Sequence, residues 1–266
     1  MRVEPSAVPI FDPGLKVRFN PARFAFQYGP DTFGPEPEYR RLDDIRPSLR
    51  DPGCTGPDPV YAIAMDVGRV QDANELRRRL LLFGVVAFAA GTLGDEPVRS
   101  QGHVHAVSPH CGSSTPELFE VWEGRAIVYA QESAGDRPGR CIAVEAGPGE
   151  QVVVPPGWAH AVINANPRAR MVFGAWCDRQ YGFAYDAIRA HGGLAWFPVV
   201  RGTRIDWERN LAYHDSQLVR RRPRDYSELA ILASIPVYVQ FVRDPESVQW
   251  VSEPARYADR WSRFEP

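Results

Sequence analysis

Residues 149–164 read GEQVVVPPGWAHAVIN, and this stretch decides the fold. The apolar run 151–154 ends in the turn sequence Pro155-Pro156-Gly157. Because proline fixes φ and glycine accepts positive φ, this turn sets the direction of the chain. The next strand then begins with His160 pointing inward, and Asn164 is placed to serve the following turn. The pattern predicts two strands of a sandwich or barrel with a histidine facing its interior.

The surrounding sequence has the same character. Short runs rich in Val, Ile, Phe, Trp and Tyr alternate with turn residues such as Ala134-Gly135-Asp136-Arg137-Pro138-Gly139. This spacing is typical of an all-β antiparallel sandwich or barrel. The predicted strands span 60–65, 80–90, 118–122, 126–131, 141–145, 151–154, 161–164, 171–176, 196–200, 236–242 and 248–251. Short helices are predicted over 42–49 and over 186–191, where Gly192-Gly193 ends the second one. Residues 72–79 are interpreted as a helical turn capped by Asp72 or as a solvated loop.

A second stretch, residues 102–124, reads GHVHAVSPHCGSSTPELFEVWEG and carries metal-binding side chains. His103 and His105 stand at i and i+2, which on a strand places both imidazoles on one face, where they can chelate one ion. In the strand that follows, alternation places Glu117 on the same face as Phe119 and Val121. Glu120 and Glu123 are interpreted as solvated. Glu117 is therefore the predicted carboxylate ligand.

Together these motifs resemble the cupin superfamily, and more narrowly the cupin-type glucose-6-phosphate isomerases of archaea and some bacteria. The likeness rests on residues 58–61, 102–106, 154–164 and 181–182, and on the spacing from the glutamate to Gly124. It implies a cupin fold, that is, a double-stranded β-helix or jelly-roll barrel. We place an irregular N-terminal arm at 1–58, the cupin barrel at 59–193 and a mixed C-terminal extension at 194–266.

The resemblance also implies roles for individual residues. One divalent ion (Fe, Mn, Ni or Zn) would be bound by four side chains, His103, His105, Glu117 and His160. Glu117 and Tyr181 would be catalytic. Substrate binding is assigned to Arg99, Ser100, Gly102, Thr115 and Tyr181.

The sequence departs from the family at the expected phosphate site. Val85 and Val86 stand where the family has paired threonines, and Ala64 stands where it has a second tyrosine. A valine cannot donate a hydrogen bond to a phosphate oxygen. Phe119 replaces another tyrosine. Either Arg99 or Arg125 and the longer loop after His105, with His110, Cys111, Ser113, Ser114 and Thr115, bind the phosphate, or the substrate differs.

The implied activity is a metal-dependent aldose–ketose exchange of glucose 6-phosphate and fructose 6-phosphate, as in glycolysis and gluconeogenesis. It would proceed by proton transfer through an enediol or by a hydride shift. The same ligands would suit a non-phosphorylated sugar isomerase or epimerase, a non-haem iron dioxygenase, or a non-catalytic sugar-binding cupin. A pocket lined by Phe88, Phe119, Trp158 and Trp176 would favour an apolar substrate.

Composition points to a small-molecule partner. A net charge of -2 gives no attraction to nucleic acid or an anionic membrane surface. The start, MRVEPSAVPIFDPG, has no apolar signal core, so we expect a cytoplasmic protein. Its four cysteines lack metal or redox spacing and are interpreted as free thiols. The arm and the open sheet edges suggest a homodimer.

Overall fold

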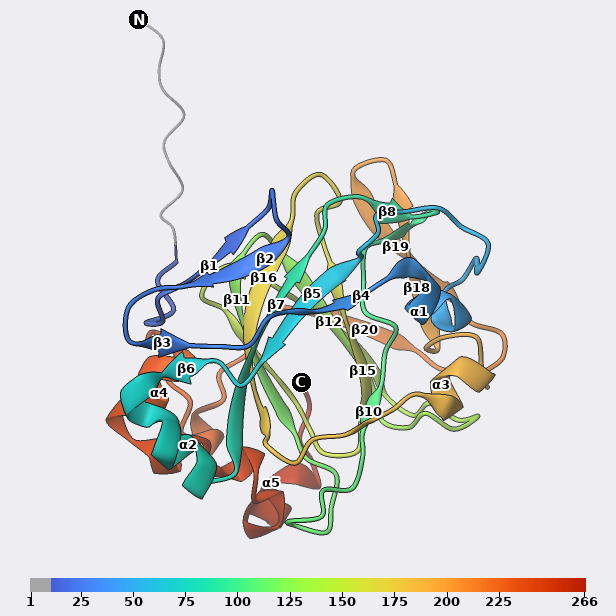
Figure 1. Ribbon diagram of the computed structural model, residues 1–266. Coiled ribbons are helices and arrows are strands. Elements are labelled where there is room, and N and C mark those ends of the chain that lie inside the picture. The colour runs from blue at the N-terminus through green and yellow to red at the C-terminus, as the bar shows by residue number, and fades with distance from the viewer. Residues whose placement is uncertain (1–10) are drawn as a thin grey trace, which may run out of the picture.

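The computed structural model describes residues 11–266, which form two β-sheets packed face to face (Figure 1). The larger sheet has six strands. In order across the sheet they are β14 (Gln151–Val154), β11 (Glu117–Glu123), β16 (Met171–Asp178), β7 (Leu81–Phe88), β5 (Tyr61–Met65) and β4 (Glu38–Arg40). All neighbours in this sheet are antiparallel.

The smaller sheet has four strands, β15 (Ala159–Asn164), β12 (Ala126–Gln131), β13 (Cys141–Ala146) and β20 (Leu218–Arg221). The chain just before β10 (Val104–His105) runs along the free side of β15. Backbone hydrogen bonds join Ser100 N to Val162 O at 2.9 Å and His103 N to His160 O at 3.0 Å. This antiparallel contact brings His103 directly opposite His160.

Three apolar layers hold the molecule together. The inner layer lies between the two sheets and includes Phe119, Val128 and Val144. A second layer covers the outer face of the larger sheet, where Trp176 stacks on Tyr238 with ring centroids 5.6 Å apart. A third covers the outer face of the smaller sheet. The central strands β7, β11, β12 and β16 therefore bury both faces, which explains their nearly continuous apolar sequences.

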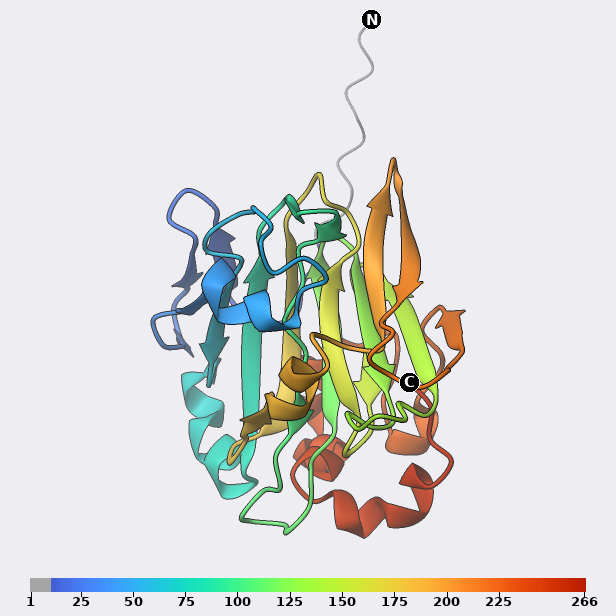
Figure 2. The ribbon, with the colours of Figure 1, turned by 90° about the vertical axis from the view of Figure 1, so that its right-hand side faces the viewer.

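Peripheral elements supply the outer layers. In Figure 2 the red C-terminal helices lie at the lower end of the barrel and the orange β18–β19 hairpin lies along one side. The remaining strands are β1 (Val17–Asn20), β2 (Ala25–Tyr28), β3 (Thr32–Phe33), β6 (Gly68–Arg69), β8 (Thr92–Leu93), β9 (Glu96–Pro97), β17 (Phe183–Ala184), β18 (Trp196–Arg201) and β19 (Arg204–Arg209). The helices are α1 (Leu42–Ile45), α2 (Ala73–Arg78), α3 (Asp186–Ala190), α4 (Val237–Arg243) and α5 (Ala258–Trp261).

The predicted all-β sandwich is confirmed. The eight predicted strands between residues 60 and 176 are all present, and the edges of β12 and β14 coincide with the prediction. The helix over 186–191 is also present as α3, with Gly192 at φ +68° after it. The predicted domain boundaries stay a prediction.

Three predictions about the periphery are wrong. The runs 236–242 and 248–251 are α4 and part of the 3-10 helix Pro245–Val251, because Pro236 and Asp244 begin helical turns there. Asp72 makes no capping bond to α2 and instead accepts a hydrogen bond from Tyr238 Oη at 3.1 Å.

The described part of the expected irregular arm is also more regular than predicted. It contains the β1–β2 hairpin and contributes β4 to the larger sheet. Residues 1–10 of that arm lie outside the described residues. Within residues 11–266, no helix has the length and apolar character needed to cross a bilayer.

Candidate metal centre

Four side chains converge at one end of the inner layer, and local structure explains how each arrives there. Glu117 opens β11, and the inward face of that strand continues with Phe119. Gly102, at φ +89°, turns the chain into the His-x-His segment. A Cβ at Gly102 would lie 2.9 Å from Leu194, so both backbone and packing require glycine here.

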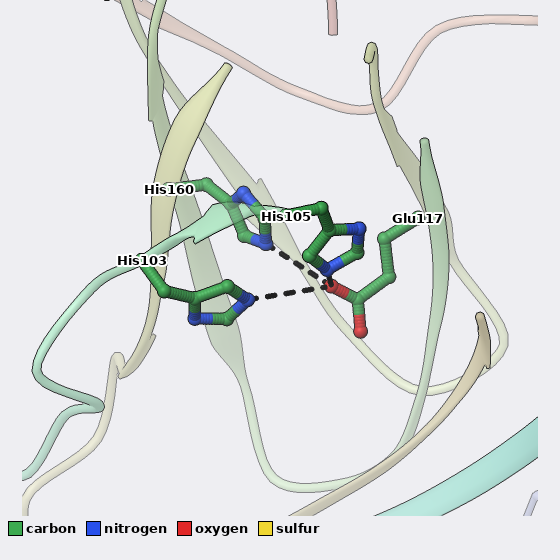
Figure 3. Close-up of side chains that lie close together, drawn as sticks. All are labelled: His103, His105, Glu117 and His160. Atoms are coloured by element: carbon green, nitrogen blue, oxygen red, sulfur yellow. Dashed lines mark hydrogen bonds and ion pairs between the residues drawn. The ribbon is translucent and has the colours of Figure 1, made fainter. Parts of the chain in front are cut away.

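The three histidines surround one oxygen of Glu117 (Figure 3). The Nε2 atoms of His160, His105 and His103 lie 3.0, 3.1 and 4.0 Å from Glu117 Oε2. His105, Glu117 and His160 are all buried, and His103 is partly so. The sequence prediction that these four residues come together is confirmed by their geometry.

Backbone carbonyls fix where the imidazole protons lie. His105 Nδ1 is 2.9 Å from Thr115 O, and His160 Nδ1 is 3.1 Å from Trp158 O. A carbonyl oxygen can only accept, so each Nδ1 carries a proton and donates it. In the neutral rings Nε2 then presents a lone pair to the centre.

This arrangement fits a metal ion. Nε2 of His103 and of His105 is buried without a hydrogen-bond partner among the described residues. Lone pairs that face a carboxylate repel it unless a cation lies between them. Ligand atoms that each lie about 2.1 Å from one ion are separated from each other by roughly 3 to 4 Å. The four ligand atoms lie within 4.8 Å of one another, so small movements of the side chains would bring them into this range.

The carboxylate is held in its ionised form. Burial alone would raise the pKa of Glu117, but its close contacts with the imidazoles of His105 and His160 hold that pKa well below its usual value. Its second oxygen, Oε1, accepts a hydrogen bond from the Cys177 thiol at 3.2 Å. Burial and neighbouring imidazoles lower the pKa of His103, which keeps this ring neutral. An anionic carboxylate and neutral imidazoles are the forms that bind a metal.

A cavity opens beside the four ligands. Its walls are largely apolar and come mostly from the inner face of the larger sheet. The apolar lining residues are Ile63, Met65, Gly84, Val86, Phe88, Phe119, Val162, Phe173, Ala175 and Phe183. The polar lining residues, apart from His103, Glu117 and Cys177, are Arg40, Tyr61, Ser100, Gln101 and Tyr185.

Several predicted substrate residues lie elsewhere. Arg99 is 3% exposed and points away from the cavity, where it bonds Glu96 at 2.7 Å and Ser48 O at 2.7 Å. Its charge is neutralised by this buried pair. Arg125 bonds Glu145 at the surface. Neither arginine can supply the positive charge that we expected near the substrate.

The long loop after His105 does not line this cavity. Among the described residues that line the cavity, none comes from 108–115. Thr115 holds His105 through its carbonyl, Ser114 Oγ accepts a bond from Gly157 N, and Cys111 Sγ lies 3.4 Å from Ser113 Oγ. His110 is exposed and outside the metal-binding group. Through Thr115, the loop therefore holds the imidazole of His105 in place.

Val85, Val86 and Ala64, which stand where the family has hydroxyl side chains, do not all face the cavity. Val86 lines the cavity, whereas Val85 and Ala64 face the outer layer. Side chains on one face are spaced by two residues, so Gly84 and Val86 are the neighbours on the cavity side. Of the four aromatic residues that were considered for the pocket lining, Phe88 and Phe119 do line the cavity. Trp176 faces the outer layer, and Trp158 is not among the lining residues.

Two further assignments change. Tyr181 packs on Phe183, with ring centroids 5.1 Å apart, and is not among the cavity-lining residues. Glu120 is fully buried rather than solvated, and it accepts hydrogen bonds from Val237 N, Gln151 Nε2 and Trp122 Nε1. Gly102 acts through the backbone turn, while Ser100 does line the cavity.

Sequence reasoning missed Arg40, Tyr61 and Tyr185 as cavity residues. Tyr61 and Tyr185 carried weak signals, since the former lies in a predicted strand and the latter near Tyr181. Arg40 carried almost none, because it lies in the arm that was predicted to be irregular. Only its pairing with Tyr61 across β4 and β5 brings it to the site.

Comparisons with known proteins indicate the family of the chain. A family model described as glucose-6-phosphate isomerase (GPI) matches residues 42–216. A protein named "Putative glucose-6-phosphate isomerase 1", from Rhizobium meliloti (strain 1021), is 32% identical over 117 residues, covering 43% of this chain and 49% of the relative. A "Glucose-6-phosphate isomerase" from Sinorhizobium medicae (strain WSM419) is 26% identical over 114 residues, with the same coverage. The chain spans about half the length of these curated relatives.

Among solved structures, recombinant oxalate oxidase in complex with glycolate is similar with a TM-score of 0.35 and 19% identity, covering 47% of this chain and 54% of that chain. Vicilin from Corylus avellana (hazelnut) has a TM-score of 0.36 and 12% identity, covering 49% of this chain and 33% of that chain.

Proposed function

Because the chain belongs to the glucose-6-phosphate isomerase family, we propose that it is a metal-dependent aldose–ketose isomerase of a sugar phosphate. The substrates that we expect are glucose 6-phosphate and fructose 6-phosphate. One observation carries the proposal: three imidazole Nε2 atoms and an ionised carboxylate oxygen converge beside a cavity. The names of the curated relatives support the reaction class.

The chemistry follows from the ligand set. A divalent ion bound by His103, His105, Glu117 and His160 would polarise a sugar carbonyl and so acidify the adjacent C–H bond. The protein's part is to fix those ligands, to exclude water with the apolar walls, and to orient the open-chain sugar. The low pKa of Glu117 suits a ligand better than a general base, whose pKa should lie near the working pH.

A second candidate function has its own support. Most of the residues that line the cavity are apolar, whereas a sugar carries a hydroxyl on nearly every carbon. Buried hydroxyls without partners lose binding energy. A metal-dependent cupin that acts on a less polar substrate, such as a non-haem iron dioxygenase, would match this lining better.

The test is a turnover assay with the protein stripped of metal and then reloaded with Fe²⁺, Mn²⁺, Ni²⁺ or Zn²⁺ in turn. We expect glucose 6-phosphate and fructose 6-phosphate to interconvert and a chelator to stop the reaction. If no metal-loaded form converts either sugar phosphate, the isomerase proposal fails. Metal-dependent oxygen uptake with a less polar substrate would then support the second candidate.

Substrate deuterated at C2 separates the two chemical routes in the same assay. Complete retention of deuterium at C1 of the product is the result expected for a hydride shift. Exchange with solvent indicates proton transfer through an enediol. Glu117 is the only carboxylate among the described residues that line the cavity, and it would be bound to the ion, so we expect nearly complete retention.

A further inference from the structure

A second set of polar residues lines the cavity besides the candidate ligands. Arg40, Tyr61, Ser100, Gln101 and Tyr185 line it, and they come from segments that are distant in the sequence. Among the described residues that line the cavity, Arg40 carries the only guanidinium group. A cavity with a metal at one place and a fixed positive charge at another can orient a molecule that has an anionic group and a reactive carbonyl.

Strand register explains why Arg40 faces the cavity. Arg40 pairs with Tyr61 across β4 and β5, and directly paired residues present their side chains on the same face. Tyr61 is 6% exposed and belongs to the inner layer. Tyr39, the preceding residue, is 38% exposed and points the other way, where its ring lies 6.4 Å from that of Phe24.

The charge of Arg40 is available to a ligand. Its carboxylate partner is Glu38, at 3.2 Å, and the two side chains are 25% and 64% exposed. Such a solvent-exposed pair contributes little free energy, so an anion with better geometry can replace it. Buried Arg99, in contrast, is committed to Glu96.

The neighbouring groups suit an anion as well. The Tyr185 ring lies in the field of Arg40, which opposes the rise that burial causes in the pKa of Tyr185. Arg189 lies 5.1 Å from the centroid of the same ring and donates to Gln101 Oε1 at 2.9 Å. This leaves the Gln101 amide nitrogen and two phenol hydroxyls as further donors.

We propose that Arg40, with Tyr61, Tyr185 and Gln101, holds the phosphate group of the substrate and makes the enzyme prefer phosphorylated over free sugars. The proposal rests on the proposed isomerase function. It accounts for Val86, which cannot donate to phosphate, because the edge strand β4 supplies a charged donor in place of a hydroxyl. Arginine is suited to this role because its planar fork can bind two phosphate oxygens at once.

The test measures binding with a pair of probes that cannot be isomerised. Sorbitol 6-phosphate and sorbitol lack the carbonyl group, so their binding to the metal-loaded protein is independent of turnover. We expect Arg40→Gln to weaken sorbitol 6-phosphate binding about 10- to 100-fold, the loss typical of charge-assisted hydrogen bonds. Sorbitol binding should change less than about twofold, and Arg40→Lys should restore part of the loss, since it keeps the charge without the fork.

Arg41→Gln is the matched control. Arg41 is the next residue, is exposed and contacts Asp58 at 3.6 Å outside the cavity. The Arg41→Gln variant should bind both probes with the affinity of the wild type. If Arg40→Gln also binds sorbitol 6-phosphate normally, or if the wild type binds the two probes equally, the phosphate assignment is wrong. If phosphate binding depends on Arg40 but no sugar phosphate is turned over, the assignment stands and the isomerase function fails.

Discussion

At the scale of single residues, the site depends on hydrogen bonds from neighbouring groups that orient the candidate ligands. The ligands themselves could be predicted, because the i, i+2 spacing of His103 and His105 and the alternation along β11 fix which side chains share a face. The carbonyl of Thr115 and the thiol of Cys177 could not be predicted. Their positions depend on the course of a loop and on which strand lies next to β11, which no local pattern records.

Cys177 should act as a positioning residue for Glu117. Burial and the charge of Glu117 raise the pKa of the thiol, so it stays protonated and donates to Oε1. This leaves Oε2 directed at the histidines. We expect Cys177→Ala to weaken metal binding about 10-fold, as lost partners of metal ligands commonly do. Competition with a coloured chelator measures the affinity.

Cys141→Ala is the control for this prediction, since Cys141 is a buried free thiol in the outer layer of the smaller sheet. It should bind metal normally. Cys177→Ser, which keeps a donor, should fall between the wild type and the alanine variant. Equal metal affinity in all four proteins would exclude the positioning role.

At the scale of elements, the pattern of short apolar runs predicted the strands of the sandwich correctly but predicted strands wrongly in the C-terminal extension. The run 236–242 is rich in Val, Tyr and Phe and was therefore predicted to be a strand. It forms α4 because Val237, Tyr238 and Phe241 pack on the larger sheet with helical spacing. The same packing buries Glu120, which accepts a hydrogen bond from the first residue of α4.

Glu120 should make stability depend on pH. Burial raises its pKa to about 7, against the effect of three N–H donors. The folded state thus binds this proton more tightly than the unfolded state, so its contribution is present below about pH 4.5 and is lost as pH rises through about 7. Relative to Glu120→Gln, the wild type should lose about 2 to 3 kcal/mol of unfolding free energy between pH 5 and pH 8.

Denaturant unfolding of both proteins at the two pH values checks this. The difference between the variants is the informative quantity, because other titrating groups contribute equally to each. A difference that does not change with pH would show that Glu120 is ionised throughout this range.

At the scale of the whole molecule, segments from both ends of the chain complete the sandwich. The N-terminal segment places Arg40 in the cavity, and the C-terminal segment covers the larger sheet. The sequence predicted the sandwich and the group of three histidines and Glu117, because both depend on local spacing. It could not predict that Arg40 lines the cavity, since this depends on the pairing of β4 with β5.

We continue to expect a homodimer. Strands β4 and β20 end their sheets, and open edges are commonly covered by a partner. Light scattering at micromolar protein concentration should give about twice the mass of the 29.8 kDa chain. A mass equal to that of one chain would contradict the expectation.

The most direct test of the metal centre is the metal content of the wild type, His160→Ala and His110→Ala after reloading with a divalent ion. His110 is a nearby exposed histidine outside the group of four. We predict a single ion per chain in the wild type and in His110→Ala, and its loss from a folded His160→Ala. Equal metal content in all three proteins, or none in the wild type, would contradict the account.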